Sequence, residues 1–299
     1  MAGRGERYGR PVTPATVREW RHGGRWLPTA GGNVFVRSGS GDGPTLLLLH
    51  GFPSSSYDFR SVIARLGQRA WLTLDFLGFG LSDKPPRHNY SLLEQADIVQ
   101  QIVADAGASP VVVIAHDMGT SVTTELLARD IDGTLPFDLR RAVLSNGSVI
   151  LERASLRPIQ KVLRSPLGPI AARLANRRMF TREFSRLFTA GHPLTAEEAA
   201  AQWALVFHNG GHRIPHRLSA YLDERVRYAP RWHGAIRDWP KPLGFAWGLQ
   251  DPVATTNVLT GLRELRPGAP VVELPGLGHY PQIEDPDAFT DAALRLLTE

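Results

Sequence analysis

The chain has 299 residues, 42% of them hydrophobic, which is enough to bury a sizeable core in one or two domains. It has no cysteine, which excludes disulfides and thiolate metal or redox sites and fits a reducing compartment. The formal charge of +5 comes mostly from arginines scattered among acids, with no basic stretch interleaved with aromatics, so we expect no nucleic-acid partner. The N-terminal segment has no apolar signal core, and no apolar run approaches the ~18–20 residues of a membrane span. We therefore predict a cytoplasmic protein without membrane insertion.

Short buried strands alternate with helical segments through most of the chain. Residues 32–39 alternate apolar and polar side chains, which predicts a half-buried strand. Further strands are predicted at 44–49, 70–74, 110–115, 139–148, 241–248 and 270–276, and helices at 90–107, 120–130, 259–265 and from 286 onward. Ser91 is a candidate N-cap, and Glu94 three residues later would complete a capping box. This alternation predicts a mostly parallel sheet with helices on both faces.

Residues 151–230 break that alternation. They contain no convincing strand and are typical of short helices separated by Pro and Gly. We interpret them as an all-helical insertion between two strands of the sheet. Ligands of open α/β sheets bind beyond the carboxyl ends of the strands, so such an insertion would form a lid over the site. The predicted organisation is a core at 1–150, a cap at 151–230 and the rest of the core at 231–299.

The loops after three predicted strands carry candidate catalytic residues. "AHDMG" has the small-x-nucleophile-x-small pattern of a nucleophile elbow, with Asp117 where many hydrolases have serine. Asp251 follows a later strand in "WGLQDPV", and His279 follows the last strand in "GLGHYPQIEDP". The order nucleophile, acid, base is that of the α/β-hydrolase fold. The oxyanion hole is then expected at the backbone amides of Phe52, in "HGFP", and Met118.

The motifs "HGFPSSSYDF", "LDFLGFGLSDKP", "HDMG" and "LGHYPQIEDP" together resemble α/β hydrolases of the epoxide hydrolase and haloalkane dehalogenase group. They are most similar to the branch that contains the mesoderm-specific transcript protein. The resemblance covers roughly residues 44–150 and 240–299. In the cap, "SAYLDERVRYAPRWHGAI" carries it best.

An aspartate nucleophile indicates displacement at a saturated carbon, because a carboxylate is already ionised at neutral pH and attack on an ester would give a reactive anhydride. The resulting alkyl ester on Asp117 would be hydrolysed by water that His279 activates. No cofactor or metal is required.

The resemblance implies an epoxide as the most fitting substrate. Haloalkane dehalogenases usually have Trp directly after the nucleophile and often Asn in the first loop, where this chain has Met118 and Phe52. Fluoroacetate dehalogenases have Arg after the nucleophile. Epoxide hydrolases use cap tyrosines as acids, and Tyr221 lies about where one belongs, although no early-cap tyrosine is present.

Several alternatives stay open at this stage. Asp117 could merely cap the following helix, since Asp is a favoured N-cap. Asp251 could form a turn before Pro252, and His279 could be a surface residue. Another hydrolase, such as a dehalogenase or esterase, or a non-catalytic binder of a small hydrophobic ligand would also fit.

Three aromatic side chains of the predicted cap are candidates for contact with a small hydrophobic substrate. Trp203 and Phe207 lie four residues apart and could equally be the lid's own core. Tyr228 lies seven residues after Tyr221 and could share its face. His208, His212 and His216 are also spaced four apart, but Gly210, Gly211 and Pro215 interrupt a continuous helix, so we interpret them as loop residues rather than a metal site.

Overall fold

The computed structural model describes residues 13–298. The first twelve residues, which make up much of the N-terminal segment without an apolar signal core, lie outside the described part. Within residues 13–298, no helix is long and apolar enough to cross a membrane. The location in the cell stays a prediction.

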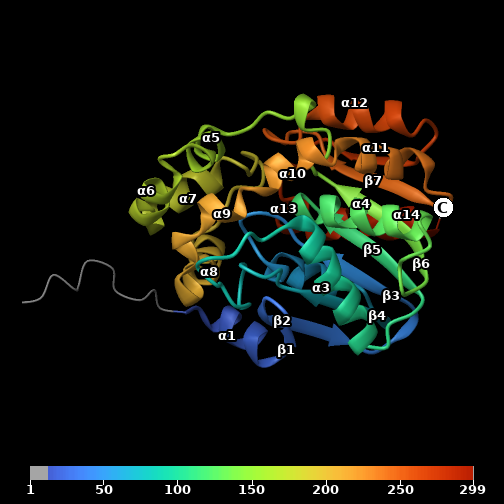
Figure 1. The fold of residues 1–299 in the computed structure, drawn as a ribbon, viewed down its shortest axis with the longest axis horizontal. Coiled ribbons are helices and arrows are strands. Elements are labelled where there is room, and N and C mark those ends of the chain that lie inside the picture. The colour runs from blue at the N-terminus through green and yellow to red at the C-terminus, as the bar shows by residue number, and fades with distance from the viewer. Residues whose placement is uncertain (1–12, 299) are drawn as a thin grey trace, which may run out of the picture.

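The described chain forms one mixed, mostly parallel sheet, as predicted (Figure 1). Its spatial order is β1-β2-β4-β3-β5-β6-β7-β8; β2 pairs antiparallel with both β1 and β4, and all other neighbouring strands pair in parallel. The strands are β1 (Arg25–Thr29), β2 (Gly32–Gly39), β3 (Asp42–Leu49), β4 (Arg69–Leu74), β5 (Val111–His116), β6 (Leu139–Ser145), β7 (Leu243–Gly248) and β8 (Val271–Leu274). The sequence analysis did not predict β1.

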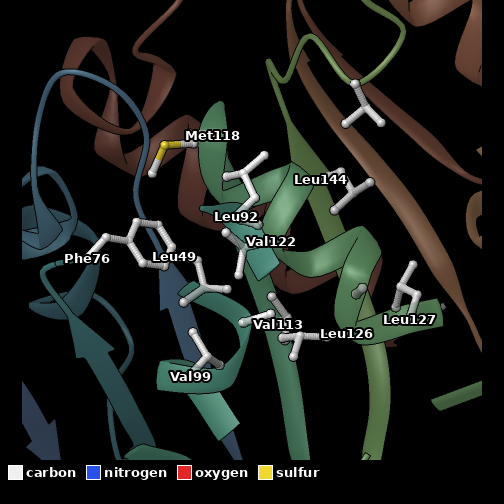
Figure 2. Packing of buried hydrophobic residues seen from close by; sticks show 14 of the residues in the cluster. Leu49, Phe76, Leu92, Val99, Val113, Met118, Val122, Leu126, Leu127 and Leu144 are labelled. Atoms are coloured by element: carbon white, nitrogen blue, oxygen red, sulfur yellow. The ribbon is translucent and has the colours of Figure 1, made fainter. Parts of the chain in front are cut away.

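Helices cover both faces of the sheet because the central strands are apolar on both sides. In β3, Leu47 and Leu49 pack on one face with α3, α4 and α11, while Leu46 and Leu48 pack on the other with α2 and α14. Figure 2 shows part of the first cluster, including Leu49, Val113 and Met118. The helices outside the insertion are α1 (Ala15–His22), η1 (Ser56–Phe59), α2 (Arg60–Ile63), α3 (Leu92–Asp105), α4 (Met118–Ile131), α11 (Ala229–Asp238), α12 (Thr256–Leu265), α13 (Pro281–Glu284) and α14 (Pro286–Thr298).

Between β6 and β7 the chain leaves the sheet and forms short helices without a strand in that described stretch. They are η2 (Leu151–Arg153), α5 (Pro158–Arg164), α6 (Gly168–Leu174), α7 (Arg177–Ser185), α8 (Ala196–Phe207), η3 (His208–Arg213), α9 (Pro215–Leu218) and α10 (Tyr221–Arg227). Figure 1 shows α5, α6 and α7 gathered at one end of the molecule, away from the sheet.

The start of α3 shows how the insertion is tied to the core. Ser91 is the N-cap, as predicted, and its hydroxyl oxygen accepts from the Leu93 amide. The predicted capping box is wrong, because Glu94 turns to His88 instead (2.6 Å). Glu224 of α10 supplies the second acceptor, since its carboxylate accepts from the Leu92 amide at 2.6 Å and from the Ser91 hydroxyl at 2.7 Å. A carboxylate at a helix N-terminus is favourable, so this contact fixes α10 above the strand ends.

Candidate active site

Asp117 lies on the sharp turn between β5 and α4. Its φ is 43° and its ψ −109°, a region that costs a non-glycine residue about 1–3 kcal/mol. Gly119 permits the turn, because a Cβ there would lie 2.5 Å from the Leu49 carbonyl oxygen. Asp117 occupies the N-cap position of α4, but its side chain makes no capping hydrogen bond, so the interpretation as a capping side chain is wrong.

The Asp117 carboxylate is buried, and each of its oxygens has a donor. The Phe52 amide donates to Oδ2 at 2.9 Å. Arg225 of α10 donates from Nη2 to Oδ1 at 3.4 Å and to the Asp117 carbonyl at 3.2 Å. Burial alone would raise the pKa of Asp117, but Arg225, two histidines and the Phe52 amide outweigh it and lower that pKa. The carboxylate is therefore held ionised.

His50 holds the loop that carries the Phe52 amide. Its Nε2 accepts from the Phe76 amide at 2.9 Å, which leaves the proton on Nδ1, 2.9 Å from the Gly51 carbonyl. Complete burial lowers the pKa of His50 to about 3, so the ring is neutral. A neutral ring with one donating and one accepting nitrogen can satisfy both loop groups at once.

His279 and Asp251 form a buried pair, with His279 Nδ1 2.7 Å from Asp251 Oδ2. Asn146 also donates to Oδ2, at 2.8 Å, while Oδ1 accepts from the amides of Val253 (2.6 Å) and Ala254 (3.0 Å). Four donors thus fix the carboxylate. The burial of His279 would lower its pKa, but the charges of Asp251 and Asp117 raise it above its ordinary value. The open nitrogen of the ring is Nε2.

A cavity of about 400 Å³ lies between the strand ends and the helical insertion, with Phe52, Asp117 and His279 in its lining. Its other walls are mostly apolar side chains of α5 to α8. They include Leu163, Ala172, Phe180, Phe184, Trp203 and Val206. An apolar cavity with a few converging polar groups is typical of a small-molecule site.

The other predicted site residues are placed differently around this cavity. Trp203 lines it, whereas Phe207 is stacked on His212 with ring centroids 4.2 Å apart, and Tyr228 packs against Trp232. Neither Phe207 nor Tyr228 is in the lining of this cavity. Met118 contributes a backbone amide at the start of α4, and its side chain is buried in the core (Figure 2).

Tyr221 lies directly behind the cavity wall. The Tyr221 hydroxyl accepts a hydrogen bond from the side-chain amide of Gln160 at 3.3 Å, and Gln160 lines the cavity. Within residues 13–298, no acceptor is found for the hydroxyl proton of Tyr221. Its ring lies between Phe52 (centroids 5.7 Å apart) and the Arg225 guanidinium (4.6 Å). Burial and the nearby Asp117 charge raise the pKa of Tyr221, so it stays protonated at neutral pH.

Sequence reasoning missed Arg225, Gln160, Asn146 and His50. Arg225 lies one turn after Tyr221, a spacing that puts the two side chains on one helix face and could have been noticed. Asn146 lies in the predicted strand segment 139–148, near the edge of the sheet where Asp117, Asp251 and His279 are also expected. Gln160 lies in a segment with no distinguishing motif, and its role depends on the tertiary packing of α5.

The three histidines spaced four apart do not share a helix face. Asn209 and Gly210 have positive φ angles, which interrupt η3 as the glycines suggested. No cluster of three or more potential metal ligands is found in the described range 13–298.

This fold and site define an α/β hydrolase, and the chain belongs to the alpha/beta hydrolase family, whose model matches residues 46–292. It is 73% identical to the "Putative hydrolase LipZ" of Mycobacterium tuberculosis, over 96% of this chain and 100% of that protein. It is 33% identical to the mesoderm-specific transcript protein of Mus musculus, over 94% of this chain and 88% of that one. The fold is similar to haloalkane dehalogenase DbeA of Bradyrhizobium elkani, with a TM-score of 0.75 and 21% identity over 92% and 97% of the two chains.

Proposed function

We propose that this protein is an epoxide hydrolase that converts small hydrophobic epoxides to vicinal diols through an ester on Asp117. The observation that carries the proposal is that Asp117 and His279 face one apolar cavity, with a protonated Tyr221 behind its wall. An ionised carboxylate needs no base to attack carbon, and an alkoxide leaving group needs an acid.

In the first step, Asp117 Oδ1 forms a bond to an epoxide carbon while the ring C–O bond breaks. Oδ1 is the attacking oxygen because its Arg225 donor is 3.4 Å away, whereas the Phe52 amide holds Oδ2 at 2.9 Å. The Tyr221 hydroxyl gives its proton to the departing oxygen, after a side-chain shift of Gln160 that admits it to the cavity. The product is a hydroxyalkyl ester and a tyrosinate.

In the second step, His279 takes a proton from water, and the hydroxide attacks Asp117 Cγ. The amides of Phe52 and Met118 stabilise the negative charge that develops on Oδ2. Collapse breaks the ester C–O bond, and the departing alkoxide takes the proton from His279 and leaves as the diol. The second proton of the water, left on the Asp117 carboxyl group, passes to the tyrosinate, which regenerates the carboxylate and a neutral Tyr221. The ester carries no charge, so its formation removes one of the charges that raise the pKa of His279. Alkylation thereby favours the neutral ring that the second step requires.

Dehalogenation is the second candidate. The observation in its favour is the Gln160 amide, an N–H donor in the cavity lining. It could hold a departing halide even though Met118 and Phe52 lack the side-chain donors of the usual halide site.

A panel of apolar epoxides and haloalkanes, assayed for diol and for halide, tests the proposal. We expect diol from epoxides and little halide. With the His279→Gln variant, the intact mass should rise by that of one epoxide, because the ester forms and persists. Normal turnover by this variant would overturn the assignment of the base. Halide release without diol would replace the first candidate with the second.

A further inference from the structure

The helices α5, α6 and α7 present an unusual set of exposed apolar side chains. Leu167 is 63% exposed, Ile170 55% and Leu174 59%, and Val162 and Met179 are also exposed. Most of the large hydrophobic side chains found exposed in residues 13–298 belong to this set, although the segment from 162 to 179 is short. Single exposed apolar residues are common on protein surfaces, but a cluster of them is typical of an interaction surface.

The same three helices are strongly basic. Between Arg157 and Leu187 the sequence has eight Lys or Arg residues and a single acid, Glu183. Arg164 and Arg186 are paired with acids. The other cations that are exposed there, with no ion pair to any described residue, are Lys161, Arg173, Arg177, Arg178 and Arg182. Apolar side chains interspersed with free cations match the chemistry of an anionic lipid surface.

The cavity opens toward this patch. Val162, Leu174 and Met179 are exposed at the surface and also line the cavity that contains Asp117. Figure 1 shows α5, α6 and α7 together at the periphery of the molecule, away from the sheet.

We propose that the face formed by α5, α6 and α7 docks reversibly on an anionic lipid bilayer, with Leu167, Ile170 and Leu174 entering the headgroup region and the surrounding arginines contacting phosphate. None of these helices spans a membrane. Docking would place the cavity mouth against the bilayer, where apolar compounds partition. The proposal does not depend on the reaction that the site catalyses, because binding is measured without substrate.

Co-sedimentation of the full-length protein with vesicles tests this inference. Vesicles would be made of phosphatidylcholine alone or with a third phosphatidylglycerol. We expect binding to the anionic vesicles that weakens as salt is raised. The double variant Leu167→Ser/Ile170→Ser should bind about tenfold more weakly. The two serines remove the apolar surface that Leu167 and Ile170 would transfer from water into the bilayer. Arg177→Gln/Arg178→Gln should lose much of the preference for anionic vesicles.

Ile131→Ser is the matched control, since Ile131 is an exposed apolar residue at the end of α4 and should not affect binding. Circular dichroism checks that each variant is folded. Failure of the wild-type protein to bind anionic vesicles, or equal binding by wild type and the Leu167/Ile170 variant, would overturn the proposal. The wild-type protein could instead form a dimer that the Leu167/Ile170 variant dissociates, and fail to bind vesicles. That result would identify a second copy of the chain as the partner of this face and would overturn the lipid proposal.

Discussion

Arg225→Met tests the energetic link between the cap helix α10 and the proposed nucleophile. Arg225 Nη2 lies 3.4 Å from Asp117 Oδ1, and both side chains are almost completely buried. With an effective dielectric constant of about 20, two unit charges at that separation attract by about 5 kcal/mol. Because the guanidinium charge is delocalised, we expect the variant to lose about 3–5 kcal/mol of unfolding free energy, as is usual when one partner of a buried pair is removed.

A double-mutant cycle separates this attraction from the other contacts of Arg225. Asp117→Asn removes the charge but leaves the Arg225 bonds to Ser121 (2.9 Å) and to the residue 117 carbonyl (3.2 Å) in place. Urea unfolding of the wild type, both single variants and the double variant gives the coupling energy. We expect at least about 2 kcal/mol. A coupling below about 0.5 kcal/mol, the usual error of additivity, would refute the reasoning.

Tyr221→Phe should slow epoxide opening by about 10²–10⁴-fold with little loss of stability, and an unchanged rate would show that the acid is elsewhere. The pKa of His279, followed by NMR titration, should be lower in Asp117→Asn than in the wild type, because the variant removes a charge that raises it; a higher value would contradict the proposed coupling. Burial raises the pKa of Asp58 from 3.8 to about 7. Between these two pH values the Asp58 carboxyl group is protonated in the folded state and ionised in the unfolded state, so the free energy of unfolding falls as the pH rises. Asp58→Asn should therefore be more stable than the wild type at about pH 8, by up to about 4 kcal/mol, with the difference vanishing near about pH 4. An equal difference at both pH values, in urea unfolding, would show that Asp58 does not titrate in this way.

The sequence predicted the parallel sheet because its strands are short, continuous apolar runs. Such runs are typical of strands that are covered by helices on both faces. It also predicted that Asp117, Asp251 and His279 lie close together, because each residue is in the loop after a strand and parallel strands end at one edge. These predictions depend on local pattern and chain order alone.

Other parts of the site depend on packing between segments that are distant in the sequence. A local sequence pattern does not predict such contacts. Glu94 satisfies the spacing of a capping box, yet it pairs with His88 while Glu224 from the cap supplies the acceptor. Arg225 is an ordinary charged residue in its helix, and only the approach of α10 to β5 brings it to Asp117. The positions of Phe207 and Tyr228 outside the cavity lining likewise depend on tertiary packing that sequence spacing does not specify.

A single turnover in ¹⁸O-labelled water, with enzyme in excess over epoxide, tests the covalent mechanism most directly. If Asp117 attacks carbon, the new hydroxyl oxygen of the diol comes from its carboxylate, and a solvent oxygen enters Asp117 when the ester is hydrolysed. We expect the label in the peptide that carries Asp117 and none in the first diol formed. Label in that diol, with an unlabelled peptide, would show that water attacks the epoxide directly and would contradict Asp117 as the nucleophile.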